Sequence, residues 1–159
     1  MNKLIILSLL FTVIFAAPTT EDIVERLVYV FKGMAKTEVA ECSQVIFNNK
    51  DTFVAVLNEA LEQFNQGEDV QKILTNALSK VVVIDGFVAK CNLLGVSSVI
   101  SKFQSESGLT EVVQTILENI SSFYSYFSQV LPKMEKKEWN EAAEDVGHLA
   151  TIATKFQVE

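Results

Sequence analysis

The spacing of apolar residues along this chain is helical almost throughout. Ile23, Leu27 and Met34 share one stripe behind a Thr-Thr-Glu-Asp run at residues 19–22, which is typical of a helix N-terminus. Later segments repeat the i, i+3, i+4 spacing of a buried helix face. The ranges that we expect to be helical are 19–34, 38–46, 52–64, 70–84, 87–103, 110–131 and 136–156.

Glycine, proline and polar runs predict where these helices end. Gly67 suits a left-handed cap, and Gly95 predicts an interruption. The polar run at residues 104–108 predicts a break, and Pro132 predicts a stop. The β-branched run 81–84 has strand propensity, but the helical stripe enters it unbroken and no second strand is present to pair with it.

The patterns together predict an all-α protein with a single domain at residues 18–159. We expect a helical bundle or array of about six to seven helices. A weak internal similarity suggests two tandem units, at about 18–90 and 91–159. The sequence 37–39 recurs at 110–112 and the sequence 68–70 at 144–146, with offsets that rise from 73 to 76. Ordinary resemblance between amphipathic helices is the alternative.

The first seventeen residues resemble a secretory signal peptide. Lys3 precedes an apolar stretch from Leu4 to Phe15, and Ala16 and Ala17 supply the small residues of a cleavage site. A membrane-spanning helix needs roughly 20 apolar residues, whereas this run ends before Pro18. We therefore expect residues 1–17 to be removed, the protein to be secreted or held in a secretory-granule lumen, and the mature chain to lack stable membrane insertion.

The two cysteines agree with secretion. Cys42 and Cys91 allow one intramolecular disulfide, which we expect to form in an oxidising compartment. Closing that loop should stabilise the fold by about 4 kcal/mol. Two buried free thiols, or an intermolecular disulfide, are the alternatives. A metal site is not expected, because the only histidine, His148, is remote in the sequence.

The charge of the chain narrows the choice of partners. The formal net charge is −7, and removal of Lys3 with the signal peptide changes the count to 12 − 20 = −8. Nucleic acids and anionic membrane surfaces require a basic footprint, and the chain offers no large cluster of basic residues. We expect no nucleic-acid partner.

The order of these features resembles a known group of proteins. A signal peptide, a helical cysteine, about fifty helical residues, a second cysteine and a Trp-Asn-x-Ala-x-x-Asp-Val-Gly stretch at residues 139–147 follow one another. This arrangement is similar to small secreted helical proteins of ciliated protists. The resemblance implies secretion and a helical fold, and it transfers no catalytic residue and no established activity.

Candidate chemistry is sparse. His148 has Asp145 and Glu144 on the same helix face, but the sequence nominates no nucleophile and no oxyanion site. The acidic pairs lack the spaced loop of an EF-hand. We therefore expect neither an enzyme nor a cofactor.

Two other features could carry function. Asn119 begins an N-glycosylation sequon inside the helix predicted at 110–131. Four aromatic residues in the same helix cover most of its circumference: Phe123, Tyr124, Tyr126 and Phe127. They form either a central helix packed on several sides, or the wall of an apolar ligand cavity or partner-binding patch.

Two functions from different classes follow. The first is a secreted structural or protein-interaction role, in which the acidic helical surface binds an unknown protein partner. The alternative is a carrier of a small apolar molecule, a fatty acid or a sterol. The alternative is favoured by the 49% hydrophobic content and the eleven phenylalanines.

Overall fold

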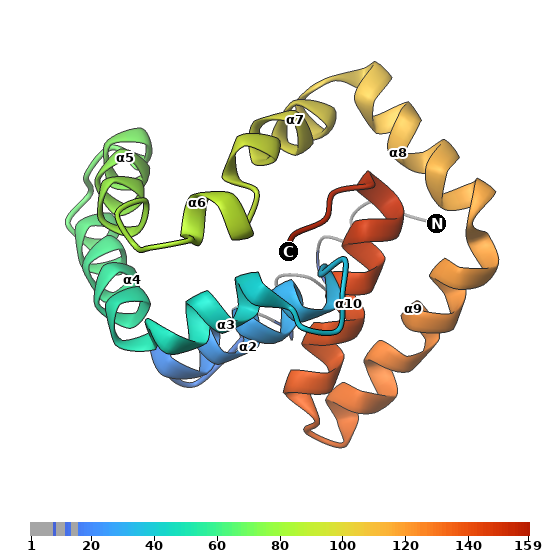
Figure 1. Ribbon diagram of the computed structural model, residues 1–159, viewed down its shortest axis with the longest axis horizontal. Coiled ribbons are helices and arrows are strands. Elements are labelled where there is room, and N and C mark those ends of the chain that lie inside the picture. The colour runs from blue at the N-terminus through green and yellow to red at the C-terminus, as the bar shows by residue number, and fades with distance from the viewer. Residues whose placement is uncertain (1–7, 9–11, 14–15) are drawn as a thin grey trace.

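The computed structural model describes residues 8, 12, 13 and 16–159, and in this part of the chain every regular element is a helix (Figure 1). The predicted all-α class is confirmed, with nine described helices where six to seven were expected. Their bounds are Thr20–Gly33 (α2), Glu41–Asn48 (α3), Lys50–Asn65 (α4), Val70–Val81 (α5), Phe87–Lys90 (α6), Leu93–Gln104 (α7), Glu106–Glu118 (α8), Ile120–Glu135 (α9) and Trp139–Thr154 (α10). Whether the two halves are tandem repeats stays a prediction.

Helices α2 and α10 cross with their backbones in direct contact. A Cβ atom added to Gly147 would lie 2.0 Å from the carbonyl oxygen of Val30, and one added to Gly33 would lie 2.1 Å from that of Glu144. Only glycine fits at either position. Apolar side chains from both helices contribute to one core, so residues from the two ends of the chain are buried together.

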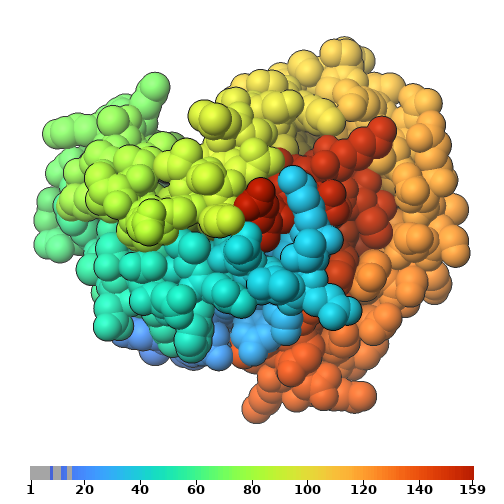
Figure 2. All heavy atoms as spheres, viewed as in Figure 1, coloured from blue at the N-terminus to red at the C-terminus, as the bar shows by residue number. Residues whose placement is uncertain are grey.

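The other helices surround this central pair. Helices α3 and α4 pack beside α2, whereas α8 and α9 pack beside α10. Helices α4 and α5 form an arm at one end of the molecule, with α8 and α9 at the other end and α6 and α7 between them (Figures 1 and 2). The molecule therefore forms an open ring of helices around α10 and the C-terminal segment.

The predicted disulfide is confirmed. Cys42 near the start of α3 and Cys91 after α6 are bonded, with their Cα atoms 4.8 Å apart. Both residues are buried. The C-terminal segment lies against this bridge, where the Cys42 amide donates to the carbonyl of Glu159 at 2.6 Å. Lys90 donates to Glu41 and Glu159, and these hydrogen bonds raise the pKa of Lys90 above its usual value.

Several predicted helix ends differ from the observed ones. Gly67 has a φ of 77°, so the left-handed cap is confirmed. The interruption expected at Gly95 lies instead at Asn92, which adopts a φ of 51° and donates its side-chain amide to the Gln157 carbonyl at 3.1 Å. The predicted break at 104–108 is a single residue, Ser105, which separates α7 from α8. Its hydroxyl caps the start of α8 by accepting from the Gly108 amide at 3.1 Å.

The helix predicted at 110–131 is two helices. The break lies at Asn119, whose backbone leaves the helical region with a φ of −118°. The predicted stop at Pro132 was wrong, because α9 continues to Glu135. Proline lacks only one amide, and the Ser128 carbonyl that this amide would have reached belongs to an exposed residue accessible to water.

The apolar stripe of that segment is buried only on one side. Helical spacing predicts one apolar stripe from Val113 to Leu131, and of its members Ile116, Phe123 and Val130 are buried. More than half of this stripe is instead exposed, because α8 and α9 lie on the outside of the ring (Figure 1). The exposed members are Val113, Leu117, Ile120, Tyr124 and Leu131.

The disulfide yields a first prediction. Replacing both cysteines, Cys42→Ala with Cys91→Ala, opens a cross-link between residues 49 positions apart. We expect the free energy of unfolding to fall by about 4 kcal/mol, because the unfolded chain gains conformational freedom. Urea unfolding followed by circular dichroism measures this change, and the reduced wild-type protein should match the variant. An unchanged free energy of unfolding would contradict the prediction.

The helix crossing yields a second prediction. In Gly147→Ala the new methyl group meets the Val30 carbonyl, so the two backbones must separate. We expect a loss of about 2 kcal/mol in the free energy of unfolding, despite the better helix propensity of alanine. Glu141→Ala, at an exposed position of α10, is the control and should change stability little. A Gly147→Ala protein as stable as the wild type would refute the close crossing.

Candidate functional site

The only arginine of the chain lies buried against the only tryptophan. Arg26 of α2 is 4% exposed. Its guanidinium carbon is 4.5 Å from the ring centroid of Trp139, the first residue of α10. This distance is typical of a cation–π interaction. A cation inside the apolar core is unusual, because its desolvation is unfavourable.

The sequence places Arg26 there through its helical register. Ile23, Arg26 and Val30 are three and four residues apart, so they share one face of α2. Val30 on this face touches α10 at the glycine crossing. A hydrogen bond of 3.0 Å from the Asn140 amide to Glu25 fixes the two helices beside the arginine.

Val13 supplies the hydrogen-bond acceptor for this arginine. The Nη1 atom of Arg26 donates to the Val13 carbonyl oxygen at 3.0 Å. Val13 is 0% exposed and belongs to the hydrophobic core. The Val13 carbonyl is the one acceptor that Arg26 has among the residues that the structure describes.

No described carboxylate forms an ion pair with Arg26. Burial lowers the pKa of Arg26 from its usual value, whereas the charges of Asp22 and Glu25 act in the opposite direction. Those two carboxylates are engaged elsewhere. Asp22 accepts from the Thr19 hydroxyl at 2.8 Å, and Glu25 accepts from Asn140. Among the described residues, the guanidinium is therefore a buried cation with one hydrogen-bond acceptor and no ion pair.

Val13 belongs to the predicted signal peptide. Of residues 1–17, the structure describes residues 8, 12, 13, 16 and 17, so most of the apolar stretch from Leu4 to Phe15 lies outside the described residues. If residues 1–17 are removed, the core loses a fully buried side chain and Arg26 loses an acceptor in the same step.

The structure disperses the predicted aromatic cluster. Phe123 is buried and stacks on Phe127, with ring centroids 6.1 Å apart. Tyr126 stacks on His148 of α10 at 4.3 Å, and Tyr124 is 65% exposed. The four rings do not line one cavity, because they point in different directions around α9.

The predicted glycosylation site occupies a helix junction. Asn119 is exposed between α8 and α9, and its side-chain amide donates to the Thr115 carbonyl at 2.9 Å. The sequence analysis placed it inside a continuous helix, which was wrong. Glycosylation of Asn119 stays a prediction.

The acidic neighbours of His148 have structural partners. Asp145 pairs with Lys133 of α9, and Glu144 lies 4.0 Å from Lys32 of α2. The Asp145 side chain is 8% exposed. These carboxylates therefore join helices, and neither one orients the histidine.

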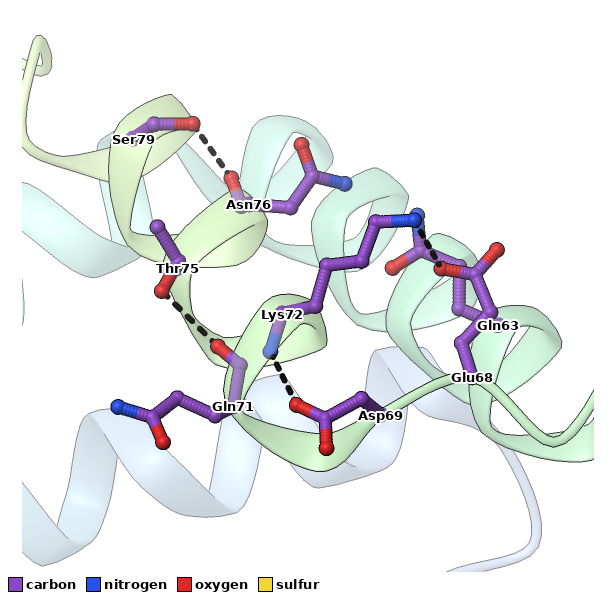
Figure 3. A pocket seen from close by; sticks show the side chains of 8 residues that line it. All are labelled: Gln63, Glu68, Asp69, Gln71, Lys72, Thr75, Asn76 and Ser79. Carbon is purple, nitrogen blue, oxygen red and sulfur yellow. Dashed lines mark hydrogen bonds and ion pairs between the residues drawn. The ribbon is translucent and has the colours of Figure 1, made fainter.

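A polar depression of about 830 Å³ lies between α4 and α5 (Figure 3). Several of its polar groups have partners within the same two helices. Asp69 caps α5 by accepting from the Lys72 amide at 3.1 Å, and Lys72 lies 3.7 Å from Glu68. Behind it, hydrogen bonds from Lys80 and Asn76 lower the pKa of Glu59. The depression is a solvated seam between two helices.

Among the described residues, no group of three histidine, cysteine, aspartate or glutamate side chains gathers as metal ligands would. In the same part of the chain, no helix combines the length and the apolar character that crossing a bilayer requires.

The sequence analysis missed Arg26. The signal was present, because this charged residue falls on the apolar stripe between Ile23 and Val30 in a chain whose other basic residues are all lysines. What the sequence does not contain is the partner. Nothing in the spacing relates residue 26 to residue 13 or to residue 139.

Comparisons of this chain with protein-family models, curated proteins and solved structures gave no match. The function is therefore inferred from the contacts of Arg26 with Val13 and Trp139.

The ion pair of Asp145 yields a third prediction. Lys133→Met leaves a buried carboxylate without its cation, and we expect a loss of about 3 kcal/mol in the free energy of unfolding. Asp145→Asn should lose less, because the Lys133 side chain is 25% exposed and reaches water. Urea unfolding of the two variants measures which substitution lowers the free energy of unfolding more. Equal losses, or a larger loss for Asp145→Asn, would show that the pair does not depend on burial of the carboxylate.

Proposed function

We propose that the protein is secreted after removal of residues 1–17, and that the mature chain carries a small apolar molecule in a core space that includes the position of Val13. The observation that supports this most directly is that the Val13 side chain is 0% exposed in the core and that its carbonyl oxygen accepts a hydrogen bond from the buried Arg26. A signal peptide is discarded, so a side chain from it is not a permanent part of a mature core. Another apolar group takes its place.

The energetics favour a ligand over an empty space. A cavity in an apolar core costs about 24 cal/mol per Å³, and a buried polar group that loses a hydrogen-bond partner costs about 1–3 kcal/mol. A molecule with an apolar body and a polar end removes both penalties together.

The remaining observations fit a secreted carrier. The disulfide between Cys42 and Cys91 is typical of proteins that fold in an oxidising compartment. The two carboxylates beside His148 in the sequence, Asp145 and Glu144, are engaged in contacts between helices. A binding role without catalysis accounts for this arrangement.

A protein-interaction role is the second candidate. It is favoured by large apolar side chains that are more than 60% exposed on the outer helices, among them Leu117 and Tyr124. Such residues mark contact surfaces when they gather in a patch. The acidic charge of the chain would restrict such a partner to a neutral or basic protein surface.

The fourth prediction tests the carrier function. Native mass spectrometry of the mature chain, residues 18–159, should reveal one apolar molecule per protein, which extraction into organic solvent then releases for identification. After extraction, titration with oleate should change the fluorescence of Trp139, which is 4.5 Å from Arg26, with saturation at one equivalent.

The matched control is the chain of residues 1–159, refolded and oxidised in parallel with the mature chain. It retains Val13 and should take up oleate at least about tenfold more weakly, because the space is occupied. A mature chain that holds no extracted molecule and takes up no oleate would eliminate the carrier function. Equal uptake by the two chains would place binding away from Val13.

A further inference from the structure

The C-terminal segment, residues 156–159, lies in a slot in the way that a bound peptide does. Phe156 is half-buried and Val158 is 0% exposed, whereas Gln157 and Glu159 are exposed. This alternation is typical of an extended strand with one face against the protein. The slot is formed by residues 34–36, Cys42, Lys90 and Asn92.

The slot holds the C-terminal segment mainly by its backbone. Val158 forms a parallel bridge with the connection between α2 and α3, in which its amide donates to the Met34 carbonyl at 3.1 Å and its carbonyl accepts from the Lys36 amide at 2.9 Å. On the other side, the Glu159 amide donates to the Lys90 carbonyl at 2.8 Å. Main-chain hydrogen bonds to an extended segment, together with a pocket for one side chain, are a common mode of peptide recognition.

The disulfide joins the two walls of the slot. In one wall, the Cys42 amide donates to the Glu159 carbonyl at 2.6 Å. Lys90 and Asn92 flank Cys91 in the other wall. Lys90 donates to the Glu159 carboxylate at 3.2 Å, and the Asn92 side chain donates to a main-chain carbonyl of the segment at 3.1 Å. A covalent bond therefore fixes the separation of the walls, whether or not the segment lies between them.

The attachment of the C-terminal segment to α10 is a single bent residue. Lys155 has a φ of 59°, in the left-handed region that residues other than glycine seldom adopt. Within the part of the chain that the structure describes, residues 157–159 form hydrogen bonds to both walls of the slot and none to α10. The segment runs from the end of α10 toward α3 and α6, and it reaches the surface between them (Figures 1 and 2). Its release would leave the hydrogen bonds of α10 intact.

We propose that the slot is a recognition site for the C-terminal segment of a second copy of this chain, which displaces the first copy's own segment and links the two molecules. The contacts between the two chains are then the ones that already form within one chain, so complementarity needs no new surface. Only the bend at Lys155 has to open. Two copies repel each other through their net charge of −7, but salt screens this repulsion, and the pair of Lys90 with Glu159 is attractive. The inference does not depend on the carrier function.

The fifth prediction tests whether the slot accepts the segment from another molecule. In the full chain, Val158→Asp places a charge at a buried position and should release the variant's own segment. The emptied slot should then bind a fluorescein-labelled peptide of residues 154–159 at one equivalent, measured by fluorescence anisotropy at physiological salt. The wild type should bind this peptide at least about tenfold more weakly, because its own segment competes.

Matched controls assign the binding to the slot. Val83→Asp makes the same change at a valine that is 79% exposed, so its own segment should stay docked and it should bind the peptide as weakly as the wild type. A labelled peptide that carries Val158→Asp should not bind to any of the chains. Val158→Ala, a milder change, should bind the unaltered peptide with intermediate affinity. Circular dichroism verifies that each variant keeps its helices.

Complementation between two variants tests the second copy as the partner. Lys36→Pro removes the amide that donates to the Val158 carbonyl, so this variant has a defective slot and an intact segment. Val158→Asp has the opposite defect. When the two are mixed in equal amounts they should form a heterodimer, whereas each alone should stay monomeric. Size-exclusion chromatography with light scattering measures both results.

Each contrary outcome is informative. A Val158→Asp chain that keeps its helices but binds no peptide would overturn the recognition site. Peptide binding without a heterodimer would overturn the second copy as the partner and show that the segment only closes its own chain. Loss of the helical signal in both Val158→Asp and Val158→Ala would show that the segment is an inseparable part of the core, which also overturns the proposal.

Discussion

The close crossing of α2 and α10 is the constraint on which the rest of the structure depends. Two glycines, Gly33 and Gly147, allow each backbone to touch carbonyl oxygens of the other helix. A backbone contact cannot adjust as side chains do, so the relative position of the two helices is fixed. Arg26 lies two turns before Gly33, and Trp139 lies about two turns before Gly147. The crossing thereby sets the distance between the cation and the ring.

The buried arginine is difficult to explain as a stabilising element. Replacing a buried charged group by a well-packed apolar side chain is often neutral or stabilising. Arg26 has instead a carbonyl acceptor from Val13 and the face of Trp139, and neither group neutralises its charge.

The sequence was informative where local patterning determines the structure. It predicted the all-α class, the Cys42–Cys91 bridge and the left-handed cap at Gly67, because each depends on a short-range pattern or on a single available pairing. It failed at Pro132, where the helix continues because water can reach the carbonyl that proline leaves without a donor. It also failed at Asn119, where the break depends on how the following helix packs. Arg26 showed the same limit, since its charge suggested an exposed position and only the three-dimensional contact with residues 13 and 139 explains its burial.

The most direct test of the account is a crystal structure of the mature chain, residues 18–159, prepared with oleate. We predict electron density for the bound molecule in a core space that includes the position of Val13, next to the Arg26 side chain. The contradictory result is a core in which the chain's own side chains have closed that space and Arg26 has turned outward to solvent.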